Sequence, residues 1–134
     1  MPLLNWDEQY MVGIKKIDKQ HTDIVNIINK LYELLDSNDN NTIIKLLEKL
    51  NDTVKKHFET ENKLMTKHKI FNYFSHKAQH DRLERILEKN LDDAKAGTFE
   101  LNKEFVLLMR DWMVNHHRFH DKKMGEELKG KGVK

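Results

Sequence analysis

Residues 43–64 read IIKLLEKLNDTVKKHFETENKL, and the side chains that form one stripe in this stretch recur at alternating spacings of four and three residues. The first four residues of the stripe are apolar, and three more follow in the same register. The seven residues are Ile43, Leu47, Leu50, Val54, His57, Glu61 and Leu64. This spacing places the stripe on one side of an α-helix that packs at a shallow angle against its neighbours. The stretch therefore predicts a long helix at about residues 41–67, whose buried side changes from apolar to ionisable along its length.

Three further stretches show the same periodicity, and they predict helices at about residues 18–37, 72–96 and 99–123. The connections between them are short, and short connections between long helices imply antiparallel neighbours. We therefore predict an all-α protein, an up-down-up-down antiparallel four-helix bundle that forms a single domain over residues 1–134.

Residues 1–17 lack helical periodicity, and we expect them to form a non-helical arm along the bundle that Trp6, Tyr10 and Met11 anchor. Residues 124–134 are rich in lysine and glycine, which indicates a frayed tail.

Composition excludes several classes of protein. The chain has 24 Lys and Arg, 22 Asp and Glu and a formal net charge of +2, with no evident basic stripe for nucleic acid. No apolar run is long enough to insert across a membrane, and the start lacks a secretory signal, so we expect a cytoplasmic protein. There is no cysteine, so any metal must be held by imidazole and carboxylate groups.

The eight histidines are the unusual feature of this composition. Six ionisable residues fall at inward positions of the predicted helices, namely His21, His57, Glu61, His76, His80 and His116. A single pair of histidines four residues apart is more often a surface or hydrogen-bonded core pair than a metal site. Histidines at inward positions on all four helices are different, because burying ionisable groups without partners costs several kcal/mol. A pair of dications at their meeting point supplies those partners.

Helix geometry does not decide which of two residues is the seventh ligand. Asp121 follows His116 by five residues, which is about 140° around an ideal helix, whereas His120 follows it by four. A π-bulge would bring Asp121 beside His116, and such bulges are common at functional sites. The local sequence does not decide between the two.

These motifs resemble those of the hemerythrin family, in particular its single-domain bacterial members. The motifs are Asp18–His21, His57–Glu61, His76–His80 and Trp112–His116 followed by Asp121. The resemblance extends to about Lys123 and includes the arm, through Asn5, Trp6 and the stretch from Val12 to Ile14.

The resemblance implies two non-haem iron ions with a bridging oxo or hydroxo group, at which dioxygen binds reversibly. Separately, we expect the protein to be a monomer. His76, His80 and His116 would hold one iron, and His21 and His57 the other. Glu61 and Asp121 would bridge the two irons, which favours Asp121 over His120.

The resemblance also implies an oxygen pocket formed by Ile24, Phe58, Trp112, Met113 and His117. Met113 and His117 depart from the family, in which aliphatic residues are usual at these positions. One hypothesis is that His117 makes the pocket more polar and speeds autoxidation. The alternative is that the side chain of His117 points outward, away from the pocket.

The ligand count indicates what such a centre does. Five imidazoles, two bridging carboxylates and a solvent bridge fill all but one of the roughly twelve positions of two octahedral ions, and the vacancy falls on the ion with two histidines. Di-iron oxidases use four carboxylates and two histidines, so this imidazole-rich set favours a carrier over an enzyme. The alternatives are a di-iron enzyme or stress protein that handles nitric oxide, peroxide or iron, and a bundle that uses metal only for structure.

Overall fold

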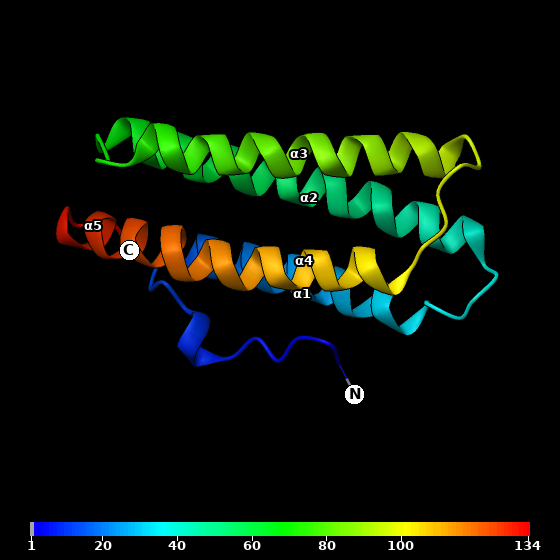
Figure 1. Ribbon diagram of the computed structural model, residues 1–134. Coiled ribbons are helices and arrows are strands. Elements are labelled where there is room, and N and C mark those ends of the chain that lie inside the picture. The colour runs from blue at the N-terminus through cyan, green and yellow to red at the C-terminus, as the bar shows by residue number, and fades with distance from the viewer. Residues whose placement is uncertain (1) are drawn as a thin grey trace.

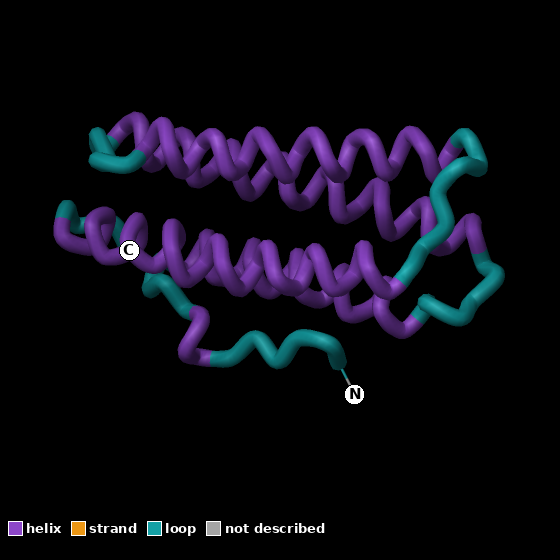
Figure 2. The backbone as a smooth tube through the Cα atoms, viewed as in Figure 1, coloured by secondary structure: helices purple, strands orange, loops and turns teal. Residues whose placement is uncertain are grey.

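The computed structural model describes residues 2–134, and it confirms the all-α four-helix bundle (Figure 1). The long helices are α1 (Lys15–Glu33), α2 (Asn40–Lys67), α3 (Tyr73–Lys95) and α4 (Lys103–His116). A π-helical segment (His117–Asp121) joins α4 to a short helix α5 (Lys122–Gly130), and a 3-10 turn (Glu8–Tyr10) lies in the arm. Successive helices run antiparallel, with α2 and α3 forming one layer and α1 and α4 the other. Residues 2–134 contain helices and loops but no strand (Figure 2).

The bundle has two apolar clusters rather than one continuous core. The larger cluster lies toward the end of the bundle that carries the α1–α2 and α3–α4 connections (Figure 1), and it contains Ile28, Leu50, Leu87 and Met109. The smaller cluster lies at the α5 end and contains Ile17, Met65, Ile70 and Leu128. The inward histidines and carboxylates lie between the two clusters, so apolar packing fixes the helices on both sides of a polar layer.

Two helices begin three or four residues away from their predicted starts, whereas the other two begin within one residue of them. α1 starts at Lys15, three residues earlier, because Asp18 does not cap it. The Asp18 carboxylate accepts hydrogen bonds from the backbone N–H groups of Val12 and Gly13, at 2.8 and 3.1 Å, and so ties the arm to the first turn. α4 starts later, at Lys103, because the side chain of Asn102 caps it by accepting from the N–H of Phe105 at 2.9 Å.

The predicted frayed tail over residues 124–134 is wrong. α5 extends through Gly130, and Met124 and Leu128 are fully buried in the smaller cluster. Gly125 makes this packing possible, because a Cβ atom there would lie only 2.8 Å from Cβ of Val12. The smaller cluster therefore joins the arm to the last helix.

The arm packs along the bundle as expected, but through partly different residues. Leu4 is buried, and its backbone exchanges two hydrogen bonds with the Asn29 side chain, at 2.9 and 3.0 Å. Trp6 stacks on Tyr10 with 4.2 Å between ring centroids. Met11, which we expected to be an anchor, is 40% exposed, and its neighbour Val12 is buried instead.

Candidate metal centre

The seven predicted ligands converge in the polar layer. All are buried, and none exposes more than 4% of its surface. His21 comes from α1, His57 and Glu61 from α2, His76 and His80 from α3, and His116 and Asp121 from α4 and the π-helical segment. The spacing of four residues on α2 and α3 stacks each pair one turn apart, so both side chains of each pair reach the same layer.

Glu61 lies between two groups of histidines. Its Oε1 atom is 3.0 Å from Nε2 of His80, and its Oε2 atom is 3.3 Å from Nε2 of His57. The two oxygens of this carboxylate therefore face different imidazoles, which is the arrangement that bridges two ions.

The two oxygens of the Asp121 carboxylate also face different imidazoles. Its Oδ1 atom is 3.1 Å from Nε2 of both His76 and His116, and its Oδ2 atom is 3.2 Å from Nε2 of His21. The π-helical segment makes this possible, because the N–H of Lys122 bonds to the carbonyl of His117 five residues earlier. The wider turn places Asp121 beside His116.

His120, the geometric alternative to Asp121, remains outside this group of ligand atoms. Its ring is half-buried and stacks on the outer side of the site, 5.1 Å from the ring of His116 and 5.4 Å from that of His76.

The ligand atoms divide into two overlapping sets. Glu61, His76, His80, His116 and Asp121 form one set, and His21, His57, Glu61 and Asp121 form the other. Within each set the ligand atoms lie within 4.8 Å of one another. The two carboxylates belong to both sets, so the geometry matches two adjacent ions with three histidines on one and two on the other.

The donor atoms fit metal ions better than they fit one another. Nε2 of His116 lies 3.1 Å from Nε2 of both His76 and His80. This matches ligands at right angles around one ion, since bonds of about 2.1 Å would separate them by about 3.0 Å. Glu61 Oε1, Glu61 Oε2 and Asp121 Oδ1 are buried without a hydrogen-bond donor in suitable geometry, although imidazole nitrogens lie close by. The donor atoms therefore gather around common centres, as metal ligands do.

The electrostatics also suit cations. Burial alone would raise the pKa of Glu61, but the imidazoles of His57 and His76 lower it well below its usual range. The imidazoles of His116, His21 and His76 likewise outweigh burial and lower the pKa of Asp121. Both carboxylates are thus anionic at neutral pH.

The pKa values of His76 and His80 are shifted in opposite directions. Burial alone would lower the pKa of His76, but the Asp121 and Glu61 carboxylates outweigh it and raise the pKa to about 9. Burial dominates at His80 and lowers its pKa to about 4. Without metal, protons on some imidazoles balance the carboxylates, and a bound cation replaces those protons.

Two polar residues that the sequence analysis did not assign hold the ligand imidazoles in position. Nδ1–H of His57 donates to Oε1 of Gln20 at 2.8 Å, and Nδ1–H of His80 donates to Oδ1 of Asn62 at 3.1 Å. Each bond leaves Nε2 unprotonated and directed at the centre. Gln20 is itself held by Thr60, whose hydroxyl accepts from Nε2 of Gln20 at 3.1 Å. Gln20 and Asn62 each adjoin a ligand in sequence, but no periodicity marks them.

We predict that Gln20→Met lowers the affinity for metal by about tenfold to a hundredfold, because His57 loses its orienting partner while the side-chain volume is kept. Asn26→Leu, at an exposed position on the same helix, is the matched control. Competition with a chelator of known affinity measures the change. Equal affinities in the two variants would show that Gln20 does not position His57.

A small enclosed cavity lies beside the two-histidine set. It has a volume of about 10 Å³, room for about one water-sized molecule. Ten residues line it, namely His21, Ile24, Val54, His57, Phe58, Leu83, Trp112, Met113, His116 and Asp121. These include Ile24, Phe58, Trp112 and Met113, four of the five residues predicted for the oxygen pocket.

His117, the fifth, does not line the cavity. It is buried under the arm, where its ring lies 5.4 Å from that of Tyr10 and 5.5 Å from that of Trp6. His117 therefore contributes no polar wall to this cavity, which agrees with the alternative that its side chain points away from the pocket. The residue after His116 turns toward the arm rather than toward the bundle axis.

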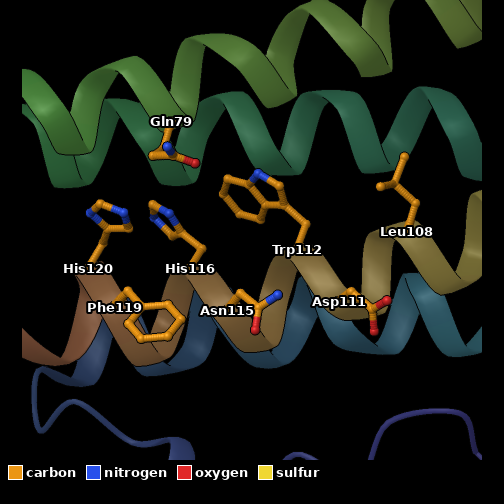
Figure 3. A pocket seen from close by; sticks show the side chains of 8 residues that line it. All are labelled: Gln79, Leu108, Asp111, Trp112, Asn115, His116, Phe119 and His120. Carbon is orange, nitrogen blue, oxygen red and sulfur yellow. The ribbon is translucent and has the colours of Figure 1, made fainter.

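Aromatic rings cover the three-histidine set. Phe58 stacks on His80 with ring centroids 3.8 Å apart, and Trp112 stacks on His116 at 4.3 Å. Outside them lies an open groove of about 370 Å³ between α3 and α4. Trp112, His116 and His120 project into this groove toward Gln79 (Figure 3). Trp112 and His116 line both this groove and the cavity.

The fold and the site define a class of protein, a helical bundle that can bind metal between histidines and bridging carboxylates. Residues 12–128 match the family model described as the hemerythrin HHE cation binding domain. The chain belongs to the hemerythrin family.

Known relatives agree with this assignment. A bacteriohemerythrin of Methylococcus capsulatus is 32% identical over 126 residues, which cover 93% of this chain and 96% of the relative. One of Pseudomonas aeruginosa is 30% identical over 121 residues, which cover 90% of this chain and 78% of the relative. A crystal structure of wild-type hemerythrin superimposes with a TM-score of 0.89 at 31% identity and covers 94% of this chain and 98% of that one. Among residues 2–134, no helix is both long and apolar enough to cross a membrane.

Proposed function

We propose that this protein binds dioxygen reversibly at two iron ions, held by His76, His80 and His116 on one side and by His21 and His57 on the other, with Glu61 and Asp121 shared. One observation carries the proposal: the set with fewer histidines adjoins a cavity of the size of one small molecule. A ligand set that is incomplete beside an enclosed space is suited to binding a small ligand rather than to structure alone.

The protein side chains have three tasks in this proposal. The seven ligands hold the ions, which supply the electrons for dioxygen binding. Gln20 and Asn62 fix the orientation of two imidazoles. Ile24, Val54, Phe58, Leu83 and Met113 surround the cavity with apolar surface, which limits the access of water and protons.

The cavity wall favours a binding protein over the enzyme alternative. The titratable groups that line it are His21, His57, His116 and Asp121, and all four belong to the ligand sets. The other lining residues are apolar or aromatic, so the wall offers no additional acid or base for turnover.

The test is spectroscopic. Protein purified with iron should contain two irons per chain and show a visible charge-transfer band that appears with dioxygen and disappears under argon, over repeated cycles. A band that forms once and decays with consumption of a reductant would favour the enzyme. A protein that holds two irons but gives no dioxygen-dependent band would contradict the proposal.

The cavity itself makes a prediction. Ile24→Phe should fill the space and abolish the dioxygen-dependent band while two irons remain bound, because Ile24 contributes wall but no ligand. Ile24→Val, which enlarges the same space, is the control and should keep the band. Iron analysis and absorption spectra of the two variants decide, and unchanged dioxygen binding in Ile24→Phe would show that the ligand enters elsewhere.

A further inference from the structure

Two phenylalanine side chains project into solvent at the α5 end of the bundle. Phe71 is 88% exposed and Phe74 is 83% exposed, whereas Phe119, another exposed phenylalanine, is 57% exposed. They lie in the α2–α3 connection and in the first turn of α3. Side chains this exposed have few neighbours, so they protrude from the surface rather than line a groove.

The turn that carries Phe71 is anchored at several points. Ile70, the preceding residue, is buried in the smaller apolar cluster. The N–H of Phe71 donates to Oε2 of Glu127 at 3.2 Å, and Nζ of Lys131 donates to the carbonyl of His68. The packing of α5 therefore holds the turn in place, and the two phenylalanines are presented by an ordered structure.

Charge is concentrated at this same end. Residues 62–78 and 118–134 meet there (Figure 1), and they carry ten Lys and Arg but only three Asp and Glu. Because the whole chain has a net charge of +2, these two segments hold +7 and all other residues together hold −5. Lys and Glu that are interspersed in the sequence are thus partly separated in space, with an excess of positive charge on these two segments.

We propose that the α5 end docks on the surface of an anionic lipid bilayer, with Phe71 and Phe74 seated at the level of the lipid headgroups. Aromatic side chains favour this interfacial region, and basic residues nearby are attracted to anionic lipids. A protruding pair of phenylalanines fits a soft bilayer surface better than it fits a protein groove. Lys67 and Lys69 precede the pair in sequence and are exposed. The protein would lie on the membrane without crossing it.

The experiment is co-sedimentation of the full iron-loaded chain with vesicles of phosphatidylcholine alone or with about one third phosphatidylglycerol. We expect binding to the anionic vesicles only, with loss of binding as salt rises toward about 0.5 M. Phe71→Ser/Phe74→Ser should weaken binding about tenfold or more. Leu108→Ser is the matched control, because Leu108 is an exposed apolar residue on α4, 47% exposed.

Charge is tested separately on one helix and its following turn. Lys67→Glu/Lys69→Glu should abolish binding, whereas Lys45→Glu/Lys49→Glu, with the same charge change toward the other end of α2, should leave most of it. Circular dichroism and iron content confirm that each variant folds.

Absence of binding to anionic vesicles at low salt would overturn the proposal, as would equal binding by Phe71→Ser/Phe74→Ser and the parent. Concentration-dependent dimerisation of the parent without vesicle binding would assign the surface to a second copy of the chain instead. None of these results depends on dioxygen binding, so they leave the proposed function to its own test.

Discussion

Glu61→Gln and Asp121→Asn will each leave the protein with no more than one bound iron per chain. Both carboxylates have one oxygen toward each histidine set, so an amide in place of either removes a bridge and the charge that offsets two adjacent dications. Without that charge, repulsion between the two ions favours single occupancy. Iron analysis after gel filtration measures the change, and the dioxygen-dependent band should vanish with the second ion.

Glu59→Gln and Asp111→Asn are the matched controls. Both residues are exposed and lie on the same helices as ligands, and neither belongs to a ligand set. Two irons in these variants together with one in Glu61→Gln would locate the effect in the bridge. Full loading of Glu61→Gln would mean that histidines alone suffice to hold both ions.

Removal of metal will lower Tm by about 10 °C or more. The polar layer buries two carboxylates and five imidazoles between two apolar clusters, and without cations these groups keep only imperfect partners. Metal that binds the folded chain and not the unfolded one adds its binding free energy to stability. A loss of about 3 kcal/mol corresponds to a shift of this size in a chain of this length.

Thermal unfolding followed by circular dichroism, with and without iron, tests this expectation. Adding Fe(II) back without oxygen should restore Tm. The Glu61→Gln variant should gain less from iron than the parent, since it holds fewer ions. A metal-free protein that melts within about 2 °C of the loaded one would show that the apolar clusters alone determine stability.

The bundle and its inward histidines were predictable because the apolar periodicity of α1, α2 and α3 is regular. Ile17, His21, Ile24, Ile28 and Leu31 are all buried, as the alternating spacing predicts. A simple rule connects such a pattern to a buried face, and it holds whether the buried residue is leucine or histidine.

The prediction failed where that regularity breaks. The π-helical segment inserts one residue after His116, so the buried face continues through Asp121, Met124 and Leu128. Ordinary helical spacing from His116 leads instead to His120, Lys123 and Glu127, which look like the surface of a tail. One backbone feature thus explains both why the spacing alone left Asp121 undecided and why α5 was missed.

Other errors have a different origin. His117 was assigned to the pocket by resemblance, but its direction depends on how the arm packs, and the arm has no periodicity to predict it. Gln20 and Asn62 act through single hydrogen bonds to ligands, and such contacts depend on tertiary geometry rather than on spacing.

The contact between Gly125 and Val12 has a consequence for how the site is sheltered. This contact joins the arm to α5 beside the ligand layer, although more than a hundred residues separate Val12 from Gly125 in sequence. Removal of either the arm or α5 would expose the same buried residues, Ile17 and Met65. The apolar packing at this end of the ligand layer therefore depends on the arm and α5, and neither of these segments contains a ligand.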